Sequence, residues 1–138
     1  MIDVRALREN PEPARASQRA RGANPGLVDE IIEADAARRE ALQAFETLRA
    51  TQKEVSKSVG RASQEERPAI LAKAKELAEQ VKAAEAAANA ADADADRLAR
   101  LLPNLVVDGV PVGGEDDFVV LRHEGPAPRD FAAEGFEP

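Results

Sequence analysis

The most regular pattern of apolar positions lies between residues 70 and 102. Apolar side chains recur there at alternating intervals of four and three residues, at Ile70, Ala74, Leu77, Val81, Ala84, Ala88, Ala91, Ala95, Leu98 and Leu102. A sustained heptad repeat of this kind predicts a long helix that packs along one narrow seam against a partner helix. Because many seam positions are alanine, the partner helix can approach closely.

Residues 27–59 predict a second long helix with a less regular seam. Its apolar positions are Leu27, Ile31, Leu42, Phe45, Leu48, Val55 and Val59, with Gln52 completing the later spacing. The alternation is imperfect around residues 42–48, but the two helices have similar lengths, about 50 and 58 Å at 1.5 Å per residue. We therefore expect them to pair with each other as an antiparallel coiled coil.

A short break at residues 57–69 separates the two helical patterns. Gly60 suits a left-handed residue that stops the first helix, and Ser63 with Glu66 fits the S-x-x-E capping box that opens the next one. A short turn between helices of similar length makes pairing within one chain entropically cheap. The sequence thus predicts a monomeric hairpin.

Two short helices are expected before the hairpin. Asp3 can cap the first, near residues 4–9. Asn10 as N-cap, Pro11 as the first helical residue and Gly22 as the stop define the second.

Beyond residue 102 the chain changes character. Proline and glycine become frequent, and Phe118–Leu121 is a short strand candidate. The predicted fold class is all-α: a helical cap (1–26), a long antiparallel two-helix hairpin (27–102, with its tip at about 57–69) and a short irregular, strand-containing segment (103–138).

Composition favours an elongated helical protein over one with a deep core or ligand pocket. Charged residues make up 33% of the chain, and its aromatic residues are Phe45, Phe118, Phe131 and Phe136. The lack of cysteine suits a cytoplasmic protein. No apolar run approaches the roughly 20 residues that cross a bilayer, so no membrane association is expected.

Charge is distributed unevenly along the predicted hairpin. The net charge is −7, yet residues 47–75 carry seven basic and three acidic side chains. Acidic residues gather instead where the first long helix starts and where the second one ends, at Asp29, Glu30, Glu33, Asp35, Asp92, Asp94 and Asp96. An acidic protein thus concentrates positive charge at one end of a long arm.

The sequence offers no candidate catalytic residue and no metal site. It lacks the glycine-rich nucleotide-binding motifs and the common hydrolase motifs. His123 follows the strand candidate and is expected to be solvated. Asp92, Asp94 and Asp96 resemble the start of a calcium loop, but Arg97 stands where that loop needs glycine.

The basic residues near the tip are the candidate binding site. We assign RNA binding to Arg49, Lys53, Lys57, Arg61, Lys73 and Lys75. Spaced by four, the first three form one stripe on a helix. Lys75 and Lys82 are seven apart and share a face, while Lys73 flanks the seam.

Two interpretations of this basic surface remain open from the residues alone. It is either a solubilising surface of a coiled coil or a surface that binds phosphates through charge-assisted hydrogen bonds and counterion release. The scarcity of aromatic residues argues against stacking on unpaired bases and favours recognition of the backbone and shape of structured RNA.

The order of motifs resembles the N-terminal region of bacterial seryl-tRNA synthetases. The resemblance is carried by "MIDVRALRENPE" at the start, by "LPN" at 102–104 and by "VPVG" at 110–113. It implies that the hairpin is a tRNA-binding arm, which grips the long variable arm and elbow of serine tRNA. The hairpin itself is generic coiled coil and adds only length and position.

The resemblance also implies properties of a larger enzyme. We expect residues 103–138 to lead into a class II catalytic domain that uses ATP and magnesium to charge tRNA with serine, and that forms a homodimer. The chain alone is expected to be non-catalytic and to need no cofactor. The competing hypothesis is a structural coiled-coil adaptor or chaperone-like hairpin without an RNA ligand, which explains the heptads equally well.

Overall fold

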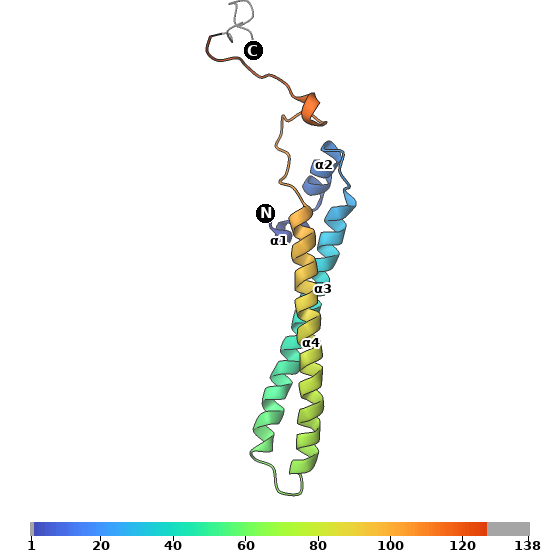
Figure 1. Ribbon diagram of the computed structural model, residues 1–138, viewed down its shortest axis with the longest axis vertical. Helices are drawn as coiled ribbons and strands as arrows, with labels where there is room; N and C mark the ends of the chain where they lie inside the picture. The colour runs from blue at the N-terminus through green and yellow to red at the C-terminus, as the bar shows by residue number, and fades with distance from the viewer. Residues whose placement is uncertain (1, 127–138) are drawn as a thin grey trace, which may run out of the picture.

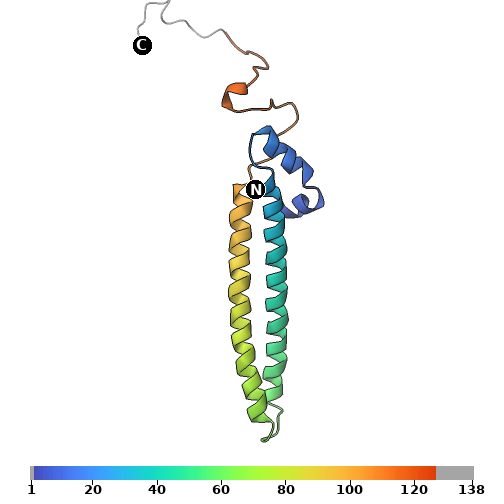
Figure 2. The same cartoon turned by 90° about the vertical axis from the view of Figure 1, so that its right-hand side faces the viewer.

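Two long helices form an antiparallel hairpin that dominates the protein. In the computed structural model, which describes residues 2–126, α3 (Gly26–Val59) and α4 (Arg67–Leu101) lie side by side over their whole length (Figures 1 and 2). The hairpin is formed within one chain, as the matched helix lengths predicted. Phe131, Phe136 and the end of the predicted C-terminal segment lie outside the described residues.

The seam of α4 is the one that the heptad repeat predicted. All ten predicted seam positions between residues 70 and 102 are buried or half-buried. Leu77, Val81, Ala88, Ala95 and Leu98 are the most deeply buried of those within the helix. Most positions between them are exposed, so α4 contributes one narrow stripe to the contact.

The seam of α3 differs from the prediction in its middle. Leu42 was expected to face the partner helix, but it is 48% exposed, and the neighbouring Ala41 is half-buried instead. The seam runs through Asp35, Arg38, Ala41 and Phe45, so the step after Arg38 is three residues, where a regular alternation would take four and reach Leu42. From Phe45 onward α3 returns to the predicted positions.

The helical cap consists of α1 (Val4–Glu9) and α2 (Glu12–Ala20). Asp3 caps α1 as predicted, since its Oδ1 accepts a hydrogen bond of 2.8 Å from the Arg5 amide. Asn10 was expected to be the N-cap of α2, but it closes α1 by donating its backbone N–H to Ala6. The cap position of α2 therefore falls to Pro11, one residue later than expected.

The hydrophobic core lies at the base of the hairpin, where four helices meet. It contains Leu7 from α1, Ala14 from α2, Val28 and Ile31 from α3, and Leu98 and Leu102 at the end of α4. This cluster is why the short α1 and α2 are held against the hairpin. Fully buried apolar side chains are confined to this end.

The link between the long helices, residues 60–66, has one predicted and two unexpected features. Ser63 and Glu66 make the contacts of a capping box, since the Ser63 amide donates to the Glu66 carboxylate at 3.2 Å and the Glu66 amide donates to the Ser63 hydroxyl at 3.3 Å. They do not open α4 as predicted, because that helix begins at Arg67 and its N-cap is Glu66, without a side-chain cap. Gly60, however, has φ −71° and not the left-handed conformation expected of a stop residue. Gly60 keeps a right-handed helical conformation, and the Arg61 amide donates to the Ser58 carbonyl at 3.1 Å.

The C-terminal segment leaves the base of the hairpin without forming the predicted strand. Residues 118–121 are extended, but no strand occurs within residues 2–126, so they have no neighbour with which to pair. A short 3₁₀ helix, η1 (Glu115–Asp117), precedes them. Three contacts tie the segment to α2 and the residue after it: Val106 to Ser17, Gly113 to Ala20, and Arg21 to Asn104.

No helix in residues 2–126 combines the length and the apolar character needed to cross a membrane.

Candidate nucleic-acid interface

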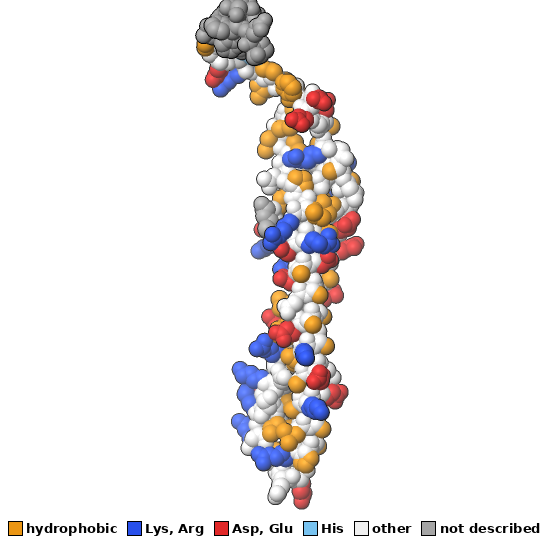
Figure 3. Space-filling model, viewed as in Figure 1, with side chains coloured by type: hydrophobic (Ala, Val, Ile, Leu, Met, Phe, Trp, Pro, Cys, Tyr) orange, Lys and Arg blue, Asp and Glu red, His pale blue; other side chains and the backbone are white. Residues whose placement is uncertain are grey.

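The six predicted RNA-binding residues all lie in the half of the hairpin away from the core. Arg49, Lys53 and Lys57 lie on the last turns of α3. Arg61 is in the link, and Lys73 and Lys75 lie on the first turns of α4. All six side chains are exposed. Figure 3 shows Lys and Arg side chains gathered along this half of the arm, with α3 carrying most of them.

Most of these cations have no acidic partner. Lys57 pairs with Glu54 on its own helix at 2.7 Å, and the Arg49 guanidinium lies over the Phe45 ring, 5.5 Å from its centre. No ion pair within residues 2–126 involves Lys53, Lys73 or Lys75. Their charge is available to an external anion.

The link adds a shallow groove of mixed charge. Its volume is about 360 Å³, and its walls include Lys57 and Arg61 together with Glu54 and Glu66. Hydrogen bonds from the Ser63 hydroxyl and amide lower the pKa of Glu66, so this carboxyl group stays ionised at neutral pH. The end of the hairpin is therefore less positive than the stretch of arm just behind it.

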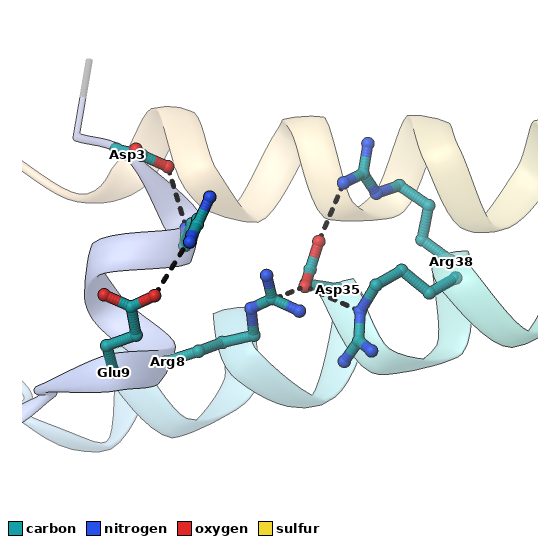
Figure 4. A network of polar contacts seen from close by, with 7 residues as sticks. Asp3, Arg8, Glu9, Asp35 and Arg38 are labelled. Carbon is teal, nitrogen blue, oxygen red and sulfur yellow. Dashed lines mark hydrogen bonds and ion pairs between the residues drawn. The ribbon is translucent and has the colours of Figure 1, made fainter.

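The base of the hairpin contains a charge cluster that the sequence analysis missed. The carboxylate of Asp35 accepts hydrogen bonds from Arg38 at 2.8 Å and Arg39 at 3.1 Å, and it lies 3.5 Å from Arg8 of α1 (Figure 4). Its side chain is only 5% exposed. Arg38 also reaches Asp92 of α4, at 3.5 Å, and so connects the two long helices.

The cluster keeps Asp35 ionised. Burial on its own would raise the pKa of this carboxyl group, but the hydrogen bonds from Arg38 and Arg39 outweigh burial and lower the pKa below its usual value. The spacing of Asp35 with Arg38 and Arg39, three and four residues apart, was a visible signal for this pairing. The third partner, Arg8, comes from another helix and has no such signal.

Other charges near the base are also compensated. Arg15 pairs with Asp29, Arg19 with Glu12, and Arg97 with Asp94. The hydrogen bond from Arg19, the larger of two arginine contributions, lowers the pKa of Glu12 against the effect of desolvation. Most basic side chains at this end of the protein are therefore paired with carboxylates of the same chain.

The exposed basic surface is suited to binding phosphate groups. Lysine and arginine bind phosphate by charge-assisted hydrogen bonds. Phe45, the aromatic residue of the arm, is half-buried beneath Arg49 and is no open platform for a base. Within residues 2–126 no group of three or more His, Cys, Asp or Glu side chains could hold a metal ion.

Comparison with known proteins gives a consistent result. The profile of the family described as "Seryl-tRNA synthetase N-terminal domain" matches residues 1–106. The serine–tRNA ligases of Beutenbergia cavernae and Micrococcus luteus are 62% and 60% identical to the chain over all 138 of its residues. The chain spans 32% of the length of each of these curated relatives, about a third.

A solved structure with the same fold supports this assignment. The crystal structure of seryl-tRNA synthetase from Pyrococcus horikoshii, complexed with ATP, superposes with a TM-score of 0.72 and 29% sequence identity. The match covers 85% of this chain and 27% of that protein. With the family profile covering most of the chain, the result is clear: the chain belongs to the seryl-tRNA synthetase N-terminal domain family.

Proposed function

We propose that the hairpin is a tRNA-binding arm that recognises the long variable arm and elbow of serine tRNA. The observation that carries the proposal is the distribution of uncompensated charge. Cations at the base are paired with carboxylates, whereas Lys53 and Lys75 near the tip have no ion pair within residues 2–126. A rigid rod with free cations far from its base suits the phosphate backbone of a structured RNA.

The chemistry of the tip fits recognition of shape better than recognition of sequence. Lysine and arginine side chains contact phosphates without reading the bases, and such contacts position a nucleic acid on a protein. The family resemblance gives the long variable arm of serine tRNA as the feature that the hairpin recognises. A straight arm of about 50 Å can lie along such a feature without unstacking any base.

In the whole protein, this arm would serve a serine–tRNA ligase. We infer that activity from the relatives of that name. The family resemblance further implies that the whole protein uses ATP and magnesium, forms a homodimer through its catalytic domain and is cytoplasmic.

The test is a binding measurement with the 138-residue chain. Fluorescence anisotropy with labelled serine tRNA is compared with that of a tRNA with a short variable arm. We expect tighter binding to serine tRNA. Neutralising the six predicted residues to glutamine should weaken binding and flatten its salt dependence, because each lost phosphate contact lowers the log–log slope by about 0.7–0.9.

The control replaces Arg5, which lies on α1 at the other end of the arm and pairs only with the exposed Glu9 within residues 2–126. This variant should bind serine tRNA like the unmodified chain. Normal binding by the six-residue variant, or equal affinity for the two tRNAs, would contradict the proposal. It would leave the adaptor or chaperone-like hairpin as the better explanation of the fold.

A further inference from the structure

The seam of the hairpin divides the basic residues of the tip half into two sets. In this half the seam positions are Leu48, Gln52, Val55 and Val59 on α3, and Ile70, Ala74, Leu77 and Val81 on α4. All eight are buried or half-buried. Successive residues in a helix are about 100° apart, so residues just before and just after a seam position emerge on opposite sides of the contact.

The antiparallel pairing decides how these sides combine. Reversing a helix reverses its apparent sense of rotation, and the seam of α4 also faces the opposite way to that of α3. The two reversals cancel. Residues that directly follow a seam position therefore lie on one common face of the hairpin, and residues that directly precede one lie on the other. We call these the following face and the preceding face.

The two faces differ sharply in charge. The following face consists of Arg49, Lys53, Ser56 and Gly60 from α3, and Leu71, Lys75, Ala78 and Lys82 from α4. The preceding face consists of Thr47, Thr51, Glu54 and Ser58 from α3, and Ala69, Lys73, Glu76 and Gln80 from α4. The first has four basic and no acidic residues, and the second has one basic and two acidic residues.

The positive charge of the following face is exposed and open to a ligand. Lys53, Lys75 and Lys82 are exposed, and no ion pair within residues 2–126 involves any of them. Figure 3 shows basic side chains over both α3 and α4 on one face of the lower arm. Toward the base, the next residues that follow seam positions are Glu46 and Glu85, which mark where the patch ends.

We propose that the RNA lies against the following face alone. On this view Lys82, which is outside the six predicted residues, is an RNA contact, and Lys73, which is among them, is not. The inference rests on the proposed function of the arm and adds the side from which the tRNA approaches. A phosphate backbone laid on the preceding face would meet Glu76, whose charge repels it, and Glu54, whose charge Lys57 partly offsets at 2.7 Å.

The test compares lysines that lie on opposite faces of the same helix, as the double variant of Lys75 and Lys82, as Lys75→Gln alone and as Lys73→Gln alone. With the 138-residue chain and serine tRNA, the double variant Lys75→Gln with Lys82→Gln should lower the log–log salt slope by about 1.4–1.8, which corresponds to two phosphate contacts. Lys73→Gln is the matched control and should leave affinity and slope unchanged. All three side chains are exposed, so circular dichroism should show unchanged helix content.

A second measurement needs no variant. Serine tRNA should protect Lys75 and Lys82 of the unmodified chain from acetylation, as read by mass spectrometry, while Lys73 stays reactive. The one-face inference would be overturned if tRNA protected Lys73 from acetylation as strongly as Lys75, or if Lys73→Gln weakened tRNA binding as much as Lys75→Gln. It would also be overturned if tRNA left the acetylation of Lys82 unchanged.

The two proposals fail in different ways. If the six-residue variant loses tRNA binding but Lys73→Gln weakens binding as much as Lys75→Gln does, only the choice of face is wrong. If the six-residue variant binds normally, the arm does not bind RNA through its tip, and both proposals are wrong.

Discussion

The two ends of the hairpin are built from the same helices but use side chains differently. At the base, Val28 and Ile31 are almost completely buried, and the carboxylate of Asp35 is shared by three arginines. Near the tip, the seam residues Val55 and Val59 are only half-buried, and Lys53 has no ion pair within the part of the chain that the structure describes.

The difference separates stability from binding. Charges that hold the protein together are paired and partly buried, so an external ligand cannot use them without breaking the fold. Charges near the tip cost little to keep in water and can be changed without loss of structure. A protein with a net charge of −7 can therefore still expose a basic surface near the tip of its hairpin.

The largest expected effect concerns packing at the two ends. Ile31→Ala should lower the free energy of unfolding by about 3 kcal/mol, since it leaves a cavity in a fully buried site. Val55→Ala, at a half-buried position near the tip, should cost about 1 kcal/mol. Urea denaturation followed by circular dichroism measures both changes, and equal losses would erase the distinction between base and tip.

The next effect concerns the charge cluster at the base. Asp35→Asn removes the charge that three arginines share, and we expect a loss of about 2 kcal/mol at pH 7, below the value for a fully buried pair because the arginines are partly exposed. Asp92→Asn is the control, since Asp92 is 69% exposed, and it should change stability little.

The same variant gives a pH dependence with a defined sign. The folded-state pKa of Asp35 is lowered, so its stabilising contribution is complete above the unfolded-state pKa of about 3.9. The contribution is lost as the pH falls through the lower folded-state pKa. The stability gap between the unmodified chain and Asp35→Asn should stay constant from pH 7 to about 4 and narrow below that. A gap that closes near neutral pH would show that Asp35 is not held ionised by its arginines.

The smallest effects distinguish the turn at each end. Gly22, after α2, has φ +67°, so Gly22→Ala should cost about 1 kcal/mol in backbone strain. Gly60, after α3, has φ −71°, and an added Cβ would meet only the Lys57 carbonyl oxygen at 3.7 Å. Gly60→Ala should therefore raise stability by about 0.5 kcal/mol. Thermal unfolding of the two variants should shift in opposite directions, and destabilisation by Gly60→Ala would refute the right-handed turn.

What could be predicted from the sequence depended on how local the cause was. The α4 seam was predicted completely because a heptad repeat is a local pattern that leaves one choice of face. Leu42 was placed wrongly because the seam takes two successive three-residue steps, from Asp35 to Arg38 and from Arg38 to Ala41, and so leaves the expected alternation. The strand at residues 118–121 was wrong because extended backbone becomes a strand only beside a partner, which no local pattern supplies.

The candidate site divides along the same line. That the six basic side chains are exposed near the tip could be predicted from composition and helix spacing. Their division between two faces follows from the predicted seam positions, because Lys73 precedes a seam position and Lys75 follows one, so the two project from opposite sides of α4. The pairing of charges at the base was not predicted, because Arg8 reaches Asp35 from another helix.

The shared carboxylate of Asp35 also has a mechanical consequence. Through its ion pair with Arg8, it holds α1 against the first third of α3 and so helps to fix the direction in which the hairpin leaves the helical cap. The 34 residues of α3 extend about 51 Å at 1.5 Å per residue, so a tilt of roughly 5° at the base would displace the far end by about 4 Å. That displacement exceeds the length of a hydrogen bond, so the packing of a few atoms at the base determines where the side chains of the tip lie.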